Sequence, residues 1–399
     1  MTSQIILGNF DGVVVASDSA SYLRDTKAVS HGNRKIVDLG DNHRVVVAIA
    51  ASAWQDGQPI SATLRQWKKS LVEPLLNIED YAESFNAFHL AGSVDFSERQ
   101  SHQNIVDSLE DHYNFLLSRL DESGVLYGGD FNWLEGIAEF VTEVGVTEIL
   151  QKGFDWLESL PNYPAISDAK ALEIFDQYDI DLEDLIFPRF AIYDLTPAQR
   201  KILLDSAPLV VSRAQYMPKG STDLHFVGYG ANDNYPGVVE VSNRGTIGNL
   251  PMQLVLPVAR LHPNDDGFSV LITPVAQDSA ITSFITGSEF NSVDLVMNQI
   301  SLALRDSRAS VNEVFEQHEI RKTVERNVDH HLQKNYIHPF QRLIGDAHLD
   351  RMSEIARTLI EIQKIRSESN NAPTTVAGDV DVVRISDAGV HWVRGRAAD

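Results

Sequence analysis

The chain has 399 residues, of which 43% are hydrophobic and 22% charged, values close to the globular average and sufficient for a sizeable core. Lysine and arginine number 33 against 56 aspartates and glutamates, so the formal net charge is −23, which argues against nucleic-acid or anionic-membrane partners because those need clustered cations. The absence of cysteine excludes disulfides, thiolate catalysis and cysteine-based metal sites.

No membrane span or signal segment is expected. The longest mostly apolar run, Val45–Trp54, is about half as long as a membrane span requires. Met1 is followed by Thr-Ser-Gln-Ile-Ile-Leu, without a basic region or a signal-type apolar segment. We therefore expect a soluble, cytoplasmic protein.

The N-terminal segment is predicted to form two β-hairpins. Ile5-Ile6-Leu7 and Val13-Val14-Val15 flank a turn with the Asp11-Gly12 dipeptide, which is a strong hairpin signal. Lys35-Ile36-Val37-Asp38-Leu39 and Val45-Val46-Val47-Ala48-Ile49 flank a second turn. The second strand of each pair is uninterrupted by polar residues, which indicates strands covered on both faces.

The middle of the chain is predicted to be helical, because apolar residues recur at helical spacing in three segments. These segments contain Ile60, Leu64, Trp67, Leu71 and Leu75; Ile105, Leu109, Tyr113, Leu116 and Leu120; and Trp133, Ile137, Phe140 and Val144. Pro74 is expected to kink or end the first helix. Glycines and prolines punctuate residues 125–206, which we predict to be an insertion of short helices.

Strands and helices alternate in blocks through the rest of the chain. Strands are expected at Leu224–Gly230, Val238–Val241, Ser269–Ile272, Asp381–Ile385 and Val390–Val393, and helices around Val296, Ile300 and Leu304 and around Met352, Ile355, Leu359 and Ile362. Strands that come in hairpins imply antiparallel sheets, and two helical blocks imply helices on their outer faces. The predicted fold is an α+β, four-layer αββα sandwich, formed by residues 1–399 as one domain with residues 125–206 inserted.

The N-terminal segment resembles the opening of proteasome β-type subunits, which are N-terminal-nucleophile (Ntn) hydrolases. Those proteins begin with a threonine strand, turn through a glycine and run an apolar strand into Ala-x-Asp-Ser, and here Gly12 and Asp18 lie at the family's offsets from Thr2. Lys35-Ile36 resembles the family's lysine position with a one-residue insertion, while Arg34 occupies the counted position. Leu224–Gly245 resembles the central hairpin of the family, and Val380–Val393 its last two strands.

The resemblance implies a catalytic set of Thr2, Asp18 and Lys35, with no cofactor and no metal. A terminal threonine supplies a hydroxyl nucleophile and an α-amine base whose pKa is about 8. The ammonium of Lys35 would lower the amine pKa and stabilise negative charge on the hydroxyl, and Asp18 would hold Lys35 in place. This chemistry requires removal of Met1, and the small side chain of Thr2 suits that removal.

Three positions depart from the family pattern. The family's oxyanion-hole glycine falls in Ala48-Ile49-Ala50-Ala51-Ser52, which has no glycine, and a side chain such as Ile49 would crowd the substrate. Ser279 and Ser288 are the candidates for its supporting serine, at unusual spacing. Pro373–Gly378 replaces its Asp-x-x-Ser-Gly motif.

Other motifs favour structural interpretations. Asp329-His330-His331 and His338 are interpreted as a polar surface, because adjacent helical residues point about 100° apart. Gly228-Tyr229-Gly230 lacks the third glycine and the following helix of a dinucleotide loop. Residues Met352–Ile365 form an apolar stripe that belongs either to the core or to an oligomer interface.

Two functions follow from these patterns. The first is threonine-dependent hydrolysis of an amide bond in a peptide or a small amide. The alternative is a non-catalytic assembly or binding protein that retains the fold. The resemblance also implies a homo-oligomer, because proteasome relatives build rings by packing helices between subunits.

Overall fold

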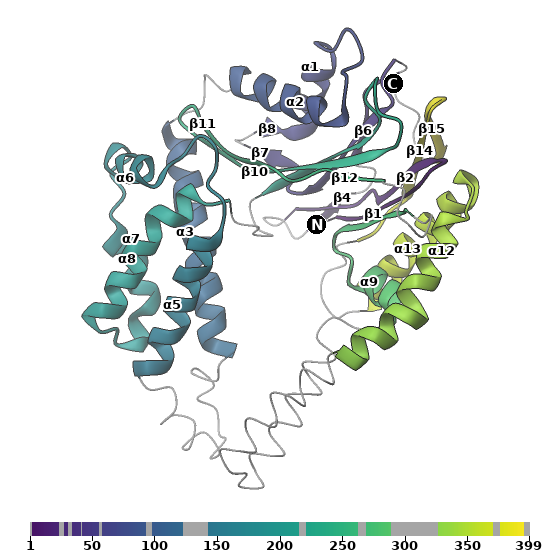
Figure 1. The fold of residues 1–399 in the computed structure, drawn as a ribbon. Coiled ribbons are helices and arrows are strands. Elements are labelled where there is room, and N and C mark those ends of the chain that lie inside the picture. Colours follow the sequence, from purple (N-terminus) through teal and green to yellow (C-terminus); the bar gives the residue numbers. More distant parts are fainter. Residues whose placement is uncertain are drawn as a thin grey trace, which may run out of the picture.

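The computed structural model describes residues 2–23, 28–30, 34–40, 42–55, 58–92, 98–122, 143–214, 221–261, 269–288, 326–369 and 376–394. These residues form a mixed α+β structure with two large antiparallel sheets and helices on either side of them (Figure 1).

The first sheet is built around the N-terminal hairpin. Its strand order is β13 (Leu271–Ala276), β1 (Ser3–Asn9), β2 (Gly12–Asp18), β14 (Val380–Ser386) and β15 (Gly389–Arg394). β1 pairs with β2 from Gln4 opposite Ser17 to Asn9 opposite Gly12, as the Asp-Gly turn predicts. Gly12 has a φ of 146°, and a Cβ there would lie 2.4 Å from the carbonyl oxygen of Ile385, so the turn requires glycine.

The second sheet contains two of the other predicted hairpins, β5–β6 and β9–β10, whereas the final hairpin belongs to the first sheet. Its strand order is β11 (Leu250–Val255), β10 (Gly237–Ile247), β9 (Thr222–Gly228), β6 (Val45–Ala51) and β5 (Ile36–Asp38). The short β12 (Ala259–Arg260) also pairs with β10, while β3 (Ser21–Leu23) pairs with β4 (Ala28–Ser30) and β7 (Trp54–Gln55) with β8 (Gln58–Pro59). β2 and β6 are buried along nearly their whole length, which agrees with their uninterrupted apolar sequences.

Apolar side chains fill three spaces around the two sheets. Ile6, Val15 and Val227 belong to the cluster between the sheets. The outer face of the first sheet is covered by α9 (Ser279–Thr286), α12 (His338–Gly345) and α13 (Leu349–Ser369), and that of the second by α1 (Ile60–Lys68) and α2 (Ile78–Gly92). The arrangement of two antiparallel sheets with helices outside them is compatible with an α+β sandwich.

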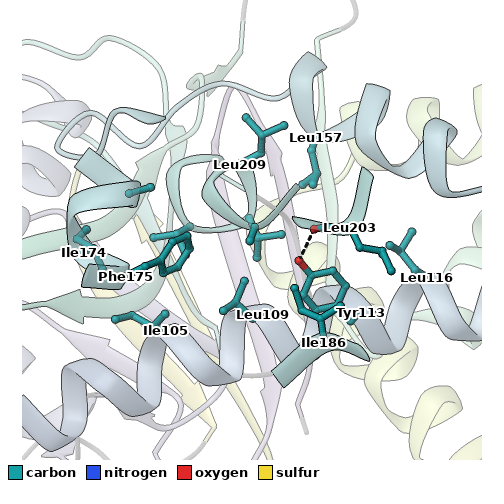
Figure 2. Packing of buried hydrophobic residues seen from close by; sticks show 14 of the residues in the cluster. Ile105, Leu109, Tyr113, Leu116, Leu157, Ile174, Phe175, Ile186, Leu203 and Leu209 are labelled. Atoms are coloured by element: carbon teal, nitrogen blue, oxygen red, sulfur yellow. Dashed lines mark hydrogen bonds between the residues drawn. The ribbon is translucent and has the colours of Figure 1, made fainter. Parts of the chain in front are cut away.

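A separate helical unit lies beside the second sheet. It comprises α3 (Glu98–Glu122), α5 (Glu143–Ser159), α6 (Asp168–Gln177), α7 (Leu182–Ile186), the 3₁₀ helix η2 (Phe187–Tyr193) and α8 (Pro197–Ser212). These helices share one apolar cluster, in which the buried Tyr113 hydroxyl donates a hydrogen bond to the Leu203 carbonyl at 2.9 Å (Figure 2). The unit includes α3, which precedes the predicted insertion 125–206. Ile247 and Met252 connect it to β10 and β11.

One helix prediction needs correction, and two others lie largely or wholly outside the described residues. The first helix ends at Lys68, well before Pro74, where the backbone N–H groups of Lys69 and Ser70 donate to the carbonyls of Gln66 and Trp67. Leu71 and Leu75 still pack on the same cluster from the following loop. The predicted helices at Trp133–Val144 and Val296–Leu304 lie largely or wholly outside the described residues.

The short helices α5 to α8 begin in the segment predicted to be a helical insertion, whereas α2, α9 and α12 were not predicted. A π-helical turn, η3 (Gln333–Ile337), leads into α12. The final hairpin, β14 and β15, forms with the register shift of a bulge between Val382 and Val383.

Candidate active site

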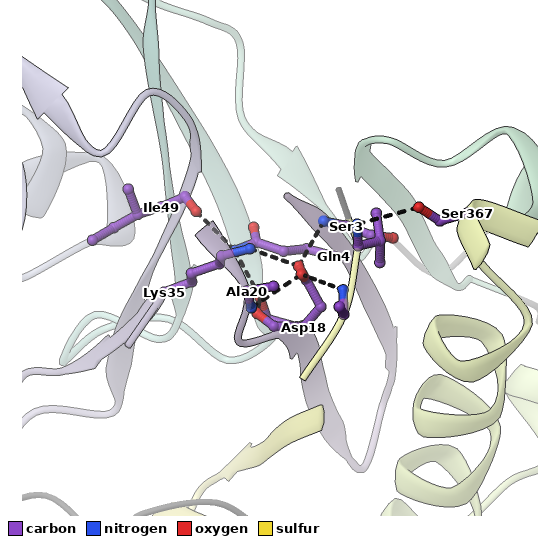
Figure 3. Close-up of polar contacts among 10 residues, drawn as sticks. Ser3, Gln4, Asp18, Ala20, Lys35, Ile49 and Ser367 are labelled. Atoms are coloured by element: carbon purple, nitrogen blue, oxygen red, sulfur yellow. Dashed lines mark hydrogen bonds and ion pairs between the residues drawn. The ribbon is translucent and has the colours of Figure 1, made fainter. Parts of the chain in front are cut away.

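Asp18 is the centre of a buried polar cluster at the end of β2 (Figure 3). Its Oδ1 accepts hydrogen bonds from the Lys35 ammonium at 2.7 Å and from the Ser3 backbone N–H at 2.9 Å. Its Oδ2 accepts the backbone N–H groups of Ala20 at 3.3 Å and Ala377 at 3.4 Å. One carboxylate therefore ties its own segment to three others: the start of β1, the residue before β5 and the segment before β14.

Lys35 reaches this carboxylate from the second sheet. It immediately precedes β5, and its side chain is 7% exposed. Burial lowers the pKa of the Lys35 ammonium, and the carboxylates of Asp18 and Asp381 act in the opposite direction. Arg34 occupies the counted family position but is exposed, so Lys35 is the residue that makes the ion pair with Asp18.

Thr2 lies at the start of β1 and is buried, with 5% of its surface exposed. Its carbonyl oxygen accepts a hydrogen bond from the Gln277 backbone N–H at 2.9 Å, and the following residue, Ser3, donates to Asp18. The backbone around Thr2 is thereby held from both neighbouring strands. The contacts join Asp18 to Lys35 directly and bring both beside the Thr2–Ser3 peptide.

The segment matched to the family's oxyanion-hole glycine forms the end of β6. Ala51, in this segment, has a φ of 61°, which lies in the left-handed region that glycine adopts at least cost. A strained residue of this kind persists only where its surroundings hold it, and such residues concentrate at functional sites. The position therefore keeps a glycine-like backbone conformation although its residue is alanine.

The two candidate supporting serines, Ser279 and Ser288, lie at different distances along the chain from Gln277, whose backbone N–H donates to the Thr2 carbonyl. Ser279 is the first residue of α9 and follows Gln277 by two residues. Ser288 follows the C-cap glycine of the same helix, Gly287. The chain path thus brings Ser279 near the Thr2 end of β1.

Two further polar residues were missed in the sequence. Gln4 directly precedes the apolar run of β1, and its side chain donates hydrogen bonds to the Ile49 carbonyl and the Ser17 hydroxyl. Asp381 lies opposite Ser17 in the β2–β14 ladder and contributes to the electrostatics of Lys35. A polar residue beside an apolar run was the available signal, but its partner could not be identified without the fold.

The histidine-containing candidates lie on the surface and not in this cluster. Asp329, His330, His331 and His338 are exposed, and among the described residues no group of His, Asp or Glu has an arrangement that could hold a metal ion. Pro373–Thr375 fall outside the described residues, and Ala377 of the same segment donates its backbone N–H to Asp18. Gly228-Tyr229-Gly230 leads into a turn and β10, and not into a helix.

Two hollows lie at the opposite end of the sheets. One, of about 340 Å³, is lined by residues that include Arg44, Tyr229 and Asp387. The other, of about 600 Å³, is lined by residues that include Phe10, His348 and Asp350. Both lie beside the hairpin turns, at the far end of β1 from Thr2.

No protein-family model matches the sequence, and a search of curated proteins finds no match either. In the part of the chain that the structure describes, no helix combines the length and the apolar character needed to cross a bilayer. The site geometry therefore carries the functional argument.

Proposed function

We propose that this protein is a threonine-dependent amide hydrolase with a proteasome-like, four-layer Ntn fold. The two antiparallel sheets, the helices on their outer faces and the placement of β1 within the first sheet support this fold assignment. The proposed catalytic residues are Thr2, Asp18 and Lys35.

The observation that carries the proposal is the buried ion pair beside Thr2. Asp18 is fully buried, Lys35 is nearly so, and their charged atoms are 2.7 Å apart. Desolvation makes such a pair costly, and a buried ion pair often contributes less to stability than well-packed apolar residues of similar volume would. Asp18 also holds the Ser3 backbone, so the pair has a direct way to position Thr2.

The proposed reaction begins with attack of the Thr2 hydroxyl on a substrate amide carbon. The free α-amine of Thr2 takes the hydroxyl proton and then delivers it to the leaving nitrogen as the C–N bond breaks. Water hydrolyses the resulting ester with the same amine as base and regenerates Thr2. The Lys35 ammonium, held by Asp18, stabilises the negative charge that develops on the Thr2 oxygen.

Labelling of Thr2 tests this proposal. Intact-mass measurement should show loss of Met1, and a β-lactone or epoxyketone probe should then modify Thr2. Thr2→Ala should abolish labelling, whereas Thr273→Ala, a substitution in the neighbouring strand β13, should preserve it. Retention of Met1 in the native protein, or hydrolysis that survives Thr2→Ala, would overturn the assignment.

The proposed substrate is a peptide or a small amide, and the proposed assembly is a homo-oligomer. Closed symmetric assemblies are the usual form of homo-oligomers, and the helices outside each sheet offer surfaces for them. Light scattering should give a mass that is a multiple of 44.4 kDa. A mass of one chain at micromolar concentration would contradict the assembly without affecting the catalytic proposal.

The second candidate is a non-catalytic assembly or binding protein with the same fold. Ala51 in the segment matched to the family's glycine and Ala377 in the segment matched to its Asp-x-x-Ser-Gly motif favour this alternative. It predicts a folded protein with Met1 removed or retained, no probe labelling and no amide hydrolysis.

A further inference from the structure

Gln4 is a fully buried polar residue on the face of β1 that looks toward the second sheet. Ile6, on the same face of this strand, packs in the apolar cluster between the sheets. Side chains alternate along a strand, so Thr2 and Gln4 also share a face. Gln4 is therefore the first side chain beyond Thr2 on that face.

The Gln4 carboxamide connects the two sheets. Its Nε2 donates to the Ile49 carbonyl on β6 at 2.9 Å and to the Ser17 hydroxyl on β2 at 3.2 Å. The Ile49 N–H in turn donates to the Lys35 carbonyl at 2.7 Å. Both polar backbone groups of Ile49 are thereby tied, one to Gln4 and one to the residue that carries the ammonium.

This connection lies close to the strained backbone of β6. Ile49 is two residues before Ala51, whose φ of 61° is uncommon for a residue with a Cβ. Strained backbone persists only where surrounding contacts over-determine it. The hydrogen bond from Gln4 is one such contact, and it comes from the strand that begins with Thr2.

The carboxamide is not fully satisfied by the described protein. Gln4 Oε1 is buried and has no hydrogen-bond partner among the described residues. A buried acceptor without a donor is destabilising, so an apolar side chain of the same shape would suit a purely structural role better. The cost is understandable if the two N–H donations serve the site.

We propose that Gln4 is a positioning residue of the Thr2 site, whose carboxamide holds the Ile49–Ala51 backbone at a set distance from the nucleophile strand. The Ile49 N–H already donates to the Lys35 carbonyl, so the Ala51 N–H is the proposed backbone donor to an oxyanion formed at Thr2. The inference rests on the proposed hydrolase function for its catalytic part. The cross-sheet connection itself can be tested independently of activity.

The experiment compares Gln4→Met with Gln253→Met in the full-length chain. Methionine keeps the length of the side chain and removes both donations. Gln253 is a matched control because it is also a buried glutamine, on β11 of the second sheet. Gln4→Glu serves as a second variant, because it replaces the donor nitrogen with oxygen and opposes the Ile49 carbonyl.

Two measurements are made on each variant. Amide hydrogen exchange in the peptide that contains Ile49–Ala51 should be about tenfold faster in Gln4→Met and unchanged in Gln253→Met. The maximal rate of Thr2 acylation by a β-lactone should fall about 10- to 100-fold in both Gln4 variants, with little change in the concentration for half-maximal rate.

The outcomes separate the two parts of the inference. Unchanged exchange in Gln4→Met overturns the cross-sheet connection, and faster exchange with normal acylation overturns its role in positioning. If the wild-type protein is not acylated while exchange still responds to Gln4→Met, the connection stands and the proposed hydrolase function falls.

Discussion

The two ends of the sheets each carry one ion pair that crosses between the sheets, and the two pairs differ in burial. At the Thr2 end, the side chains of Lys35 and Asp18 are 7% and 0% exposed. At the turn end, Arg44 lies 3.1 Å from Asp387, with side-chain exposures of 26% and 85%. The geometry is similar, but the free energy of forming the pair is not.

Solvent explains the contrast. An exposed pair gives up little hydration and contributes about 0–1 kcal/mol, so the Arg44–Asp387 pair is a surface feature. A buried pair must offset several kcal/mol of desolvation per ion, which excellent geometry and further hydrogen bonds can do. Asp18 has those further bonds, from the backbone N–H groups of Ser3, Ala20 and Ala377.

The surroundings of the two ion pairs also differ in their exposure to solvent. At the turn end, the Arg44 guanidinium also stacks 5.1 Å from the Tyr229 ring centroid and borders a hollow. At the Thr2 end, the charges are enclosed by strand backbone. The apolar cluster between the two sheets already joins one sheet to the other. We therefore infer that the buried pair is retained to position Thr2 and not to stabilise the packing of the sheets.

Removal of the buried carboxylate should have the largest effect. Asp18→Ala leaves the Lys35 ammonium buried without its partner and removes the acceptor of three backbone N–H groups. We expect the free energy of unfolding to fall by about 3–5 kcal/mol in urea denaturation. Asp387→Ala at the turn end should change it by less than about 0.5 kcal/mol. Similar losses in the two variants would remove the distinction between the ends.

The pH dependence of stability should sharpen the comparison. Burial places the folded-state pKa of Lys35 below 10.5, the ordinary value for an exposed lysine, so in the window between these two values the unfolded state binds more protons. Stability should therefore rise with pH through this window, and the penalty for the buried ammonium should be fully present below the folded-state pKa. Each pH unit within the window contributes up to about 1.4 kcal/mol.

Lys35→Arg provides the reference for this measurement, because arginine stays charged throughout the range. As the pH is raised from about 8, the free energy of unfolding of the wild type should increase relative to that of this variant. The slopes should be compared, since arginine also changes the packing. Parallel curves for the two proteins would contradict the assigned direction of the Lys35 pKa.

The smallest expected effect concerns backbone strain at the two ends. Ala51→Gly relieves a positive φ and should stabilise the protein by about 0.5–1 kcal/mol, as measured by urea denaturation. Gly389, in the last hairpin turn, has a φ of 114° with open space around it, so Gly389→Ala should cost about 1 kcal/mol through backbone strain alone. A destabilising Ala51→Gly would show that the Ala51 methyl group contributes packing that outweighs the strain.

The hairpins and the main amphipathic helices could be predicted because their signals are local. Asp11-Gly12 marks the β1–β2 turn, and the apolar spacing from Ile105 to Leu120 marks α3. The end of α1 at Lys68 could not be located in this way, because Leu71 and Leu75 continue the apolar spacing while packing from a loop. Apolar periodicity indicates which residues are buried, but it does not determine whether the backbone at those residues is a helix or a loop.

The sequence by itself determined the composition of the candidate site: a threonine at the start of an apolar strand, Asp18 at the end of the next strand, and a basic pair, Arg34 and Lys35, before the third. Only the tertiary structure decided which basic residue meets the carboxylate, and that Gln4 reaches Ile49 across the sheets. The reason is physical. Turns and strands follow from residues close in sequence, whereas an ion pair or a cross-sheet hydrogen bond depends on how two sheets are stacked, which is set by apolar side chains throughout the chain.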